Sequence, residues 1–500
     1  MAREVELKLE IDPAQAAKLR SHPALRAEPQ RQRLVSTYFD TPKGKLRRNG
    51  WVLRVRQLGD GWVQTVKRSC DGAGLYDRDE WEVPVESRTP DRQAISATPL
   101  KALIGPRQLG HLQPVFRTEV ERSTWQVNPN GARAGQAEWL LRPGTASASI
   151  EIAYDEGSIL AGEASEPICE LELELKDGDA GALFEAAREI AKRVPVRIGV
   201  TTKSERGFAL TGGGRHAVKA PPLAVSAKLS VADGFAAIVA ACIRHFRLNE
   251  PLLARSRDAE AMHQVRVATR RLRTALWLFR PAVRDSKYAA INERLRKLTR
   301  ELGAARNIDV ILTTMSNQDP AWDHLQRDRE RLYIRILKML ETRRFRLFML
   351  DLLAWTHDGD WRDDRKAKVK LARFACKRLD KLWQDISEAG ARLSSLSDEA
   401  RHTLRIDAKK MRYALEFLGG INPSAEDAQK KFIKAAEGVQ DVLGHLNDLA
   451  TRRAILSTNV PDSEKDLARC LRAAKRYLSQ MTAIGPFWRE TARAKNPPTR

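Results

Sequence analysis

Apolar and charged residues alternate with a period of two in several short stretches of the first 210 residues. The opening run EVELK sets Glu4, Glu6 and Lys8 on one side of an extended segment and places Val5 and Leu7 on the other. The same alternation recurs in WVLRVRQ, VQTVKRS, RDEWEVPV and CELELELK. This pattern predicts strands of an antiparallel sheet that has one apolar face and one charged face.

A single strand of this kind is typical of a sheet that turns its charged face to solvent. Several together favour a closed barrel with a charged interior, because carboxylates gather at both ends of the region and the strands between them supply arginine and lysine. Paired carboxylates are the hard oxygen ligands that Mg²⁺ or Mn²⁺ prefers, while arginine and lysine neutralise phosphate oxygens. The pattern therefore predicts a lumen that holds a metal-bound polyanion.

From about residue 224 the apolar positions recur with helical spacing, and one unit occurs twice. HQVRVATRRLRTALWLF and HTLRIDAKKMRYALEFL align without a gap at an offset of 139 residues, and LGAARNIDV and LGHLNDLA follow them. At about 100° per residue, the basic positions of each copy fall on one side of a helix and the apolar positions on the other. The first stripe comprises His263, Arg266, Arg270, Arg271 and Arg273, and the second comprises His402, Arg405, Lys409, Lys410 and Arg412.

Such like-charge crowding costs stability unless an anion relieves it, so the two stripes predict a polyanion site. Neither histidine has a His, Cys or carboxylate three or four residues further on. Phosphate contact or hydrogen bonding is therefore favoured for His263 and His402 over metal binding.

Charge separates the two halves of the chain. Residues 1–210 hold 31 Lys and Arg against 30 Asp and Glu, whereas residues 211–500 hold 56 against 34 and supply nearly all of the net charge of +23. TGGGRHAVKAPPL lies at the change and is typical of a linker. We expect a barrel domain over 1–210, a linker over 211–225, a helical domain over 226–490 and a tail over 491–500.

The barrel motifs resemble the CYTH, or triphosphate tunnel metalloenzyme, family over about residues 3–210. The resemblance rests on ExExK, STYFDTPKGKLRRNGWVLRVR, VQTVKRS, CELELELK and TTKSERGFAL in that order. It implies an eight-stranded antiparallel β tunnel with covering helices that binds triphosphates together with a divalent metal ion, Mg²⁺ or Mn²⁺. Family members include inorganic triphosphatases, thiamine triphosphatases, class IV adenylyl cyclases and RNA triphosphatases.

The resemblance also implies roles for individual residues. Glu4, Glu6 and Lys8 match the catalytic motif, in which the carboxylates bind metal and the lysine binds phosphate. Glu170 and Glu172 match the late acidic pair, although Glu174 lies on the same face and leaves the register open. Asp155 is a further expected metal ligand. The expected triphosphate-binding residues, besides Lys8, are Arg54, Arg56, Lys67, Arg117, Arg122, Lys203 and Arg206.

Both copies of the pattern H-x-x-R-x-x-x-[RK]-[RK]-x-R resemble the CHAD family over about residues 226–490. The resemblance implies an all-α pair of helical bundles with an internal twofold repeat and a basic groove that binds inorganic polyphosphate. One departure is Arg306-Asn307, where the family more usually has Arg-Asp. The expected fold is thus α+β and multidomain, with an N-terminal β barrel and an all-α C-terminal domain.

The leading hypothesis is a metal-dependent inorganic triphosphatase whose helical domain binds polyphosphate. Two alternatives remain open: a polyphosphate-targeting protein without turnover, and a hydrolase of thiamine triphosphate, nucleotides or RNA 5′-triphosphates. Nucleic acid is disfavoured as a partner, because the aromatic residues near the stripes fall on or beside the apolar face and single-strand binders usually stack bases.

Apolar run lengths and cysteine usage bear on the location of the protein. No stretch approaches the roughly 18 apolar residues that would span a bilayer, and no signal peptide is expected at the N-terminus. The five cysteines are scattered and odd in number. We expect a cytoplasmic protein without a membrane partner, and polyphosphate granules are a candidate place of association. The oligomeric state is left open.

Overall fold

The computed structural model describes the chain apart from residues 1, 26, 69–71, 128–147, 213–215, 224, 457–463 and 490–500. The expected tail and parts of the expected linker lie outside the described residues. Contacts group the chain into two compact units. The first unit holds residues 1–219, 240–268 and 297–358, and the second holds 220–239, 269–296 and 359–500. The barrel and several segments of the helical half therefore belong to the same unit.

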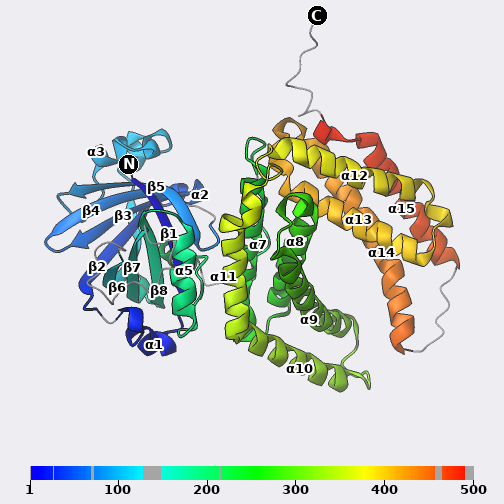
Figure 1. Cartoon of the computed structure of the whole chain (residues 1–500), viewed down its shortest axis with the longest axis horizontal. Helices are drawn as coiled ribbons and strands as arrows, with labels where there is room; N and C mark the ends of the chain where they lie inside the picture. Colours follow the sequence, from blue (N-terminus) through cyan, green and yellow to red (C-terminus); the bar gives the residue numbers. More distant parts are fainter. Residues whose placement is uncertain are drawn as a thin grey trace, which may run out of the picture. The chain divides into compact units, whose positions relative to one another are not determined.

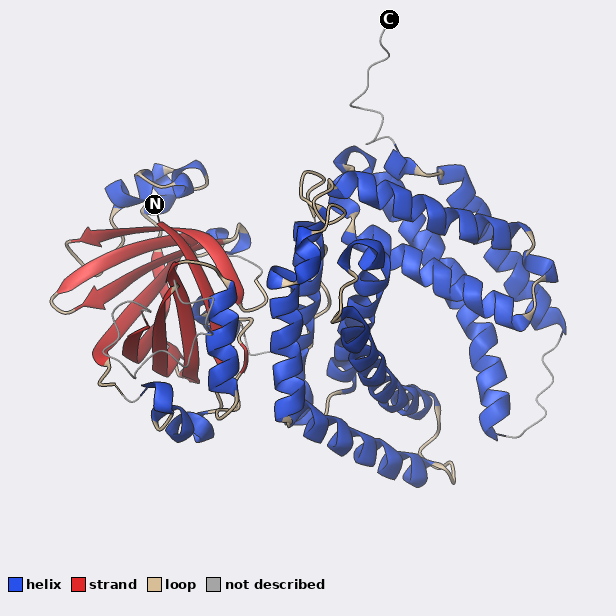
Figure 2. Ribbon diagram, in the orientation of Figure 1, coloured by secondary structure: helices blue, strands red, loops and turns tan. Residues whose placement is uncertain are grey.

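Eight antiparallel strands close into the barrel that the alternating pattern predicts (Figure 2). They are β1 (Ala2–Glu10), β2 (Gln30–Asp40), β3 (Trp51–Leu58), β4 (Gly61–Arg68), β5 (Leu75–Val85), β6 (Gln113–Val127), β7 (Ser149–Ala161) and β8 (Ala164–Asp177). Their order is β5-β4-β3-β2-β6-β7-β8-β1, and pairing between β1 and β5 closes the ring. A two-residue strand, β9 (Arg197–Ile198), pairs with the end of β1.

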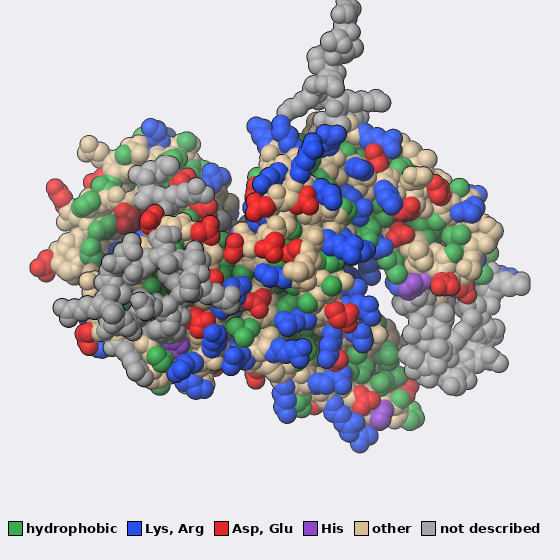
Figure 3. All heavy atoms as spheres, in the orientation of Figure 1, with side chains coloured by type: hydrophobic (Ala, Val, Ile, Leu, Met, Phe, Trp, Pro, Cys, Tyr) green, Lys and Arg blue, Asp and Glu red, His purple; other side chains and the backbone are tan. Residues whose placement is uncertain are grey.

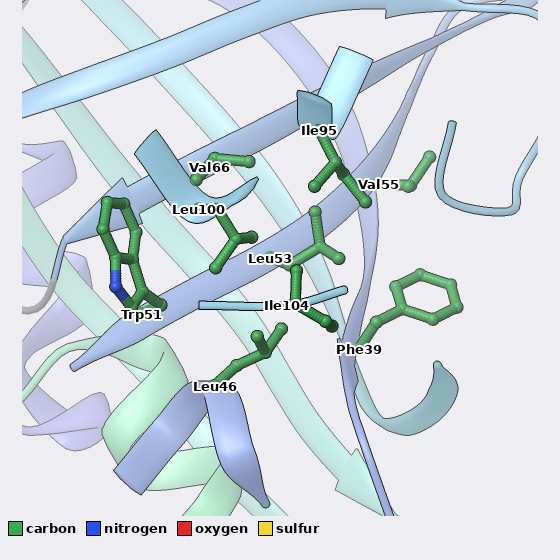
Figure 4. Packing of buried hydrophobic residues seen from close by; sticks show 9 residues of the cluster. All are labelled: Phe39, Leu46, Trp51, Leu53, Val55, Val66, Ile95, Leu100 and Ile104. Atoms are coloured by element: carbon green, nitrogen blue, oxygen red, sulfur yellow. The ribbon is translucent and has the colours of Figure 1, made fainter. Parts of the chain in front are cut away.

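The outward-facing apolar residues lie beneath short helices. Figure 4 shows Phe39, Leu53 and Val66 of β2–β4 packed against Ile95 and Leu100 of the segment that follows β5. On the opposite wall, helix α5 (Gly181–Ala191) packs on β1 and β8, where Leu7, Leu9, Leu171 and Leu173 are buried. The remaining short helices of the barrel are α1 (Ala16–Arg20), α2 (Lys45–Arg48), α3 (Arg92–Ser96) and α4 (Pro106–Leu109).

Helix α6 (Lys203–Leu210) packs against inward-facing residues of the barrel. Phe208 joins an apolar cluster with Tyr38 and Phe116, which lie on the same strand faces as the charged residues. The ring centroids of Phe116 and Phe208 are 5.1 Å apart. Gly207 permits this close approach, because a Cβ there would lie 2.2 Å from the Phe116 ring. The position of α6 thereby brings the side chains at its first turn toward the lumen.

The chain from residue 231 onward is helical, as the sequence predicts (Figure 1). The helices are α7 (Val231–Ser256), α8 (Ala259–Val283), α9 (Tyr288–Thr314), α10 (Trp322–Glu341), α11 (Arg343–Asp358), α12 (Leu371–Ala391), α13 (Asp398–Phe417), α14 (Glu426–Leu456) and α15 (Glu464–Ile484). No helix in the described part of the chain is long and apolar enough to cross a bilayer. The described cysteines are buried free thiols.

The sequence repeat corresponds to a repeat in three dimensions. Helices α8 and α13 contain the duplicated motif, and their apolar sides are buried. In each copy the first stripe arginine lies against a glycine of a later helix. A Cβ at Gly303 of α9 would lie 3.8 Å from Arg266 Nε, and a Cβ at Gly444 of α14 would lie 3.9 Å from Arg405 Nη1. The duplication therefore extends to equivalent helix contacts.

Candidate functional site

Three carboxylates, two buried and one half-buried, meet on the inner face of β7 and β8. Oxygen atoms of Asp155, Glu170 and Glu172 lie within 4.8 Å of one another. Lys203 from the first turn of α6 contacts all three, with its Nζ 2.6 Å from Asp155 and 2.8 Å from Glu172. Burial would raise the pKa of Glu172, but Lys203 and then Arg122 outweigh it and hold the pKa well below its usual range. We call Asp155, Glu170 and Glu172 the carboxylate trio.

Further cations surround the carboxylate trio. Lys8 Nζ lies 2.6 Å from Glu170 Oε1 and 3.6 Å from Glu172 Oε1. Arg122 binds Asp155 through two hydrogen bonds of 2.7 Å and reaches Glu172 at 2.5 Å. Arg206 Nη1 lies 3.3 Å from Glu170 Oε2. Strands far apart in the sequence thus supply one network of alternating charge.

The ExExK strand forms the next part of the wall. Arg78 of β5 donates to Glu4 at 3.0 Å and to Glu6 at 2.8 Å, because β1 and β5 pair with Glu4 opposite Arg78. Lys67 of β4 lies 3.1 Å from Glu4 and 2.8 Å from Glu80. These contacts continue the charged network from β1 across β5 to β4.

Glu4 and Glu6 differ sharply in acidity. Burial would raise the pKa of Glu4, but Lys67 and Arg78 bring it down to about 2. Burial and the neighbouring charge of Glu172 raise the pKa of Glu6 to about 7, although Arg78 acts in the opposite direction. Lys8 of the same motif contacts Glu170, so the ExExK strand and the carboxylate trio face the same space.

Strand β3 contributes two arginines, Arg54 and Arg56, to the charged lumen. Arg54 Nη2 lies 3.4 Å from Glu82 and 3.7 Å from Glu80. Arg56 donates from Nε to the Ser36 hydroxyl at 3.3 Å. Within the described residues, no carboxylate oxygen lies within 4.0 Å of Arg56. Burial, together with the positive charges of Arg54 and Arg122, lowers the pKa of Arg56 to about 10. Arg56 is therefore a half-buried cation with two other cations nearby.

The structure brings together most of the barrel residues that the sequence singled out. Glu174 does not join the carboxylate trio, because its carboxylate lies 2.8 Å from Lys176 at a more exposed position. Arg117 also lies apart, exposed and 3.0 Å from Glu119. An odd number of positions separates Arg117 from Arg122, so the two side chains project from opposite faces of β6.

The expected list missed several charged residues of the lumen. Arg78, Glu80 and Glu82 occupy alternate positions of RDEWEVPV and share one face of β5. This alternation in the sequence indicates that they lie in the lumen. Tyr38 was also missed. Burial would raise its pKa, but Arg54, Lys203 and Arg56 lower it. Its inward position follows from the pairing of β2 with β3, which sets Tyr38 opposite Arg54.

The two cationic stripes meet at one aromatic ring of the second unit. The guanidinium carbon of Arg270 lies 5.2 Å from the Tyr413 ring centroid, and that of Arg412 lies 4.3 Å from it. Glu416 bridges the copies as well, because it accepts from Arg271 at 3.0 Å and from Arg412 at 2.5 Å. Helices α8 and α13 thus contact each other where the stripes converge.

The other members of the stripes occupy varied surroundings. Lys410 binds Asp407 at 2.8 Å and lies over the Trp277 ring. Arg273 is half-buried, and burial followed by the charge of Arg296 lowers its pKa. The remaining positions are also half-buried on the same helices: His263, Arg266, His402, Arg405 and Lys409.

A barrel with a charged lumen, followed by a helical repeat with cationic stripes, is the class of protein that this fold and site define. The CYTH domain model matches residues 2–208, and the CHAD domain model matches residues 237–457. The chain therefore consists of a CYTH domain followed by a CHAD domain.

Two relatives place this architecture among other proteins. The inorganic triphosphatase of Haemophilus influenzae is 31% identical over 216 residues of the CYTH region. The match covers 42% of this chain and 55% of the relative, so the chain spans about half of that protein's length. An uncharacterized protein of Mycobacterium tuberculosis is 26% identical over 449 residues, which cover 84% of this chain and 81% of that protein.

Two solved structures align with parts of this chain. The CHAD domain from the plant Ricinus communis is 27% identical, with a TM-score of 0.44, and the alignment covers 57% of this chain and 99% of that one. HpAC1 from Hippeastrum, described as having a dominant triphosphatase activity, is 16% identical with a TM-score of 0.31. That alignment covers 43% of this chain and 97% of HpAC1.

Proposed function

We propose that this protein is a metal-dependent inorganic triphosphatase whose CHAD domain binds inorganic polyphosphate. The observation that supports hydrolysis most strongly is the placement of the carboxylate trio and the arginines of β3 in one lumen. The name of the Haemophilus influenzae relative points to the same substrate. A cytoplasmic location remains part of the proposal.

The carboxylate trio fits a divalent metal ion. It supplies hard oxygen donors close enough to share one cation, and the ammonium group of Lys203 holds the place of that cation in this structure. Mg²⁺ or Mn²⁺ bound there would neutralise phosphate charge and act as a Lewis acid. Glu4 and Glu6 are further candidate ligands, because Glu6 lies within electrostatic range of Glu172.

The cations of the lumen are the proposed ligands of the triphosphate. Arg56 can bind a phosphate oxygen without breaking an ion pair, whereas Lys8 and Arg122 exchange a carboxylate for a phosphate. Preorganised charges of this kind stabilise the charge that develops during phosphoryl transfer, where positioning and electrostatics supply most of the rate. A glutamate of the ExExK strand that does not bind the metal ion would orient or deprotonate the attacking water.

The convergence of the stripes supports polyphosphate binding by the CHAD domain. Arg270 from one copy and Arg412 from the other share the Tyr413 ring, so a linear polyanion that follows one stripe reaches the second. Burial, followed by the positive charge of Arg296, lowers the pKa of Arg273, and an anion bound beside the two arginines would offset their repulsion. The second contact of a long chain would be effectively intramolecular, which raises its avidity.

The aromatic residues near the stripes argue against single-stranded nucleic acid as the main ligand. Phe279, Tyr413 and Phe417 are buried, and Trp277 has Arg378 and Lys410 over its ring. None of these rings offers an open platform for stacked bases, which such binders usually provide. Thiamine triphosphate, nucleotides and RNA 5′-triphosphates stay alternative substrates of the barrel.

Phosphate release by the purified full-length protein tests the proposal. We expect release from tripolyphosphate in the presence of Mg²⁺ or Mn²⁺ and none after chelation. ATP, thiamine triphosphate and a 5′-triphosphorylated RNA, assayed in parallel, identify the substrate class. Binding of triphosphate without any release would instead support the non-catalytic alternative.

A further inference from the structure

A short segment outside the barrel wall positions both lysines that contact Glu170. Residues 197–206, which we call the strap, run from β9 into the first turn of α6 and contain Lys203. The strap also holds Lys8 from behind, since Gly199 donates its amide to the Lys8 carbonyl at 2.9 Å. A Cβ at Gly199 would lie 2.8 Å from Lys8 Cγ, so the two segments are in close contact.

Arg244 of α7 binds the strap at the start of α6. Its guanidinium donates to the Val200 carbonyl and, at 2.5 Å, to Glu205 Oε1. Glu205 completes the capping box of α6, whose N-cap is Thr202, because its other oxygen accepts from the Thr202 amide at 2.8 Å. Arg244 therefore holds the carboxylate that orients the helix bearing Lys203.

Arg247, one turn further along α7, binds the other end of the strap. Its Nε donates to the Ile198 carbonyl at 3.0 Å, and its Nη2 donates to Glu10 Oε2 at 2.9 Å. Glu10 follows Lys8 on the charged face of β1, opposite Arg197 of the strap. The remaining guanidinium nitrogen of Arg247, Nη1, donates to Glu250, and only 4% of the Arg247 side chain is exposed. One guanidinium thus joins α7, the strap and the catalytic strand.

The strap borders a cavity, so the hydrogen bonds from Arg244 and Arg247 help to fix its position. A cavity of about 750 Å³ lies beside it and is lined in part by Arg206, Arg247 and Glu10. Arg197 and Arg206, the two ends of the strap, line this cavity, so close packing alone does not fix the strap there. Between these ends, Arg247 and Arg244 bind the carbonyl groups of Ile198 and Val200.

We propose that Arg244 and Arg247 of the helical half are positioning residues of the triphosphate site. They hold the strap at the depth at which Lys203 reaches the carboxylate trio and Lys8 reaches Glu170. This inference rests on the proposed triphosphatase function. It makes a part of the CHAD domain necessary for catalysis in the CYTH domain, in addition to any role in polyphosphate binding.

Full-length variants Arg244→Ala and Arg247→Ala test this inference by steady-state hydrolysis of tripolyphosphate. A displacement of about 1 Å at a positioned group costs on the order of 100-fold in rate, so we expect kcat/KM to fall about 10- to 100-fold. Arg247→Lys keeps the charge but loses the forked geometry, and we expect it to restore only part of the rate. Polyphosphate binding by the stripes should stay unchanged.

Arg188→Ala is the matched control. Arg188 of α5 binds Asp351 of α11 at 2.7 Å, so it also joins the barrel to a helix of the CHAD domain without touching the strap. We expect it to keep wild-type kcat/KM. Equal losses in the control and in both strap variants would mean that the arginines act only through general docking of the helices, and would overturn the inference.

Hydrogen exchange gives a readout that does not depend on activity. The Gly199 amide should exchange at least tenfold faster in Arg247→Ala than in wild type, with no change in Arg188→Ala. Unchanged exchange across residues 197–206 in both strap variants would overturn the inference. Absence of hydrolysis by the wild-type protein would instead count against the proposed function and leave this measurement decisive for the strap.

Discussion

Lys8 Nζ lies 2.6 Å from Oε1 of Glu170, although 162 residues separate them in the sequence. The contact joins the first strand of the barrel to the last, and both side chains are nearly inaccessible to solvent. Two buried charges are stable only when each has a partner, and here the partners are shared, because Lys203 and Arg206 also contact Glu170 and Lys8 also reaches Glu172. Charged partners are shared in this way throughout the lumen. Substitution of one residue therefore tests its contribution to the whole network.

We expect Glu172→Gln to lower kcat for metal-dependent tripolyphosphate hydrolysis about 100-fold or more, because it removes one charge of the carboxylate trio and little volume. Glu174→Gln is the control, since Glu174 lies two residues along the same strand and binds Lys176. We expect wild-type turnover for it. Full activity of Glu172→Gln at saturating Mg²⁺ and Mn²⁺ would remove the carboxylate trio from the mechanism.

Substitution of Arg56 by glutamine should weaken triphosphate binding. Loss of one charged hydrogen bond corresponds to about a 10- to 100-fold decrease in kcat/KM. Arg117→Gln removes the same charge from the exposed face of β6 and should leave kcat/KM unchanged. Initial rates over a range of substrate concentrations measure kcat/KM for both variants. Equal decreases in kcat/KM would contradict the assignment of Arg56 to the triphosphate site.

Replacement of Lys203 by methionine should make stability depend on metal. Loss of the ammonium group leaves the carboxylate trio without its nearest cation, and removing one partner of a buried pair typically costs roughly 3–5 kcal/mol. We expect a lower Tm without metal and a larger rise in Tm on adding Mg²⁺ than in wild type. Lys192→Met, at an exposed pair with Glu189, should change neither value. An equal Mg²⁺ response in all three proteins would argue against a metal at this position.

Both stripes should be necessary for tight binding of long polyphosphate. We expect Arg266→Ala/Arg270→Ala and Arg405→Ala/Lys409→Ala each to weaken it more than tenfold, with smaller losses for chains too short to contact both stripes. Calorimetric titration at fixed salt measures this, because affinity for a linear polyanion falls with ionic strength.

The control for the stripes is Lys430→Ala/Arg469→Ala, which removes two exposed charges elsewhere on the same domain. We expect its affinity to stay within about twofold of wild type. Triphosphate hydrolysis should be unaffected in all of these variants. Equal losses for short and long chains would mean that the stripes act as independent patches.

Much of the fold was accessible from local patterns. Alternation in EVELK and CELELELK predicted strands whose aliphatic side is buried, and Leu7 and Leu171 are fully buried. The repeat at an offset of 139 residues predicted equivalent helices, and Arg266 and Arg405 each lie against a glycine of a later helix. These patterns are informative because a strand or an amphipathic helix assigns each side chain to one face by its spacing alone.

The membership of the site was less accessible. Resemblance alone placed Arg117 beside Arg122, although their spacing assigns them to opposite faces of β6. Arg78 lies between Glu4 and Glu6 because β1 pairs with β5, and pairing between distant strands leaves no local trace in the sequence. Glu172 rather than Glu174 belongs to the site because Glu172 contacts Lys203, which α6 carries.

The sequence by itself determined the order of strands and helices, the charged face of each strand and the separation of a nearly neutral half from a strongly basic one. These features follow from composition and from the period of each element. Only the tertiary structure decided which charges are neighbours, that α6 brings Lys203 to the carboxylate trio, and that α7 holds the strap through Arg244 and Arg247. Burial and pairing set the acidity of each charged group, and both depend on the residues that long-range packing brings together.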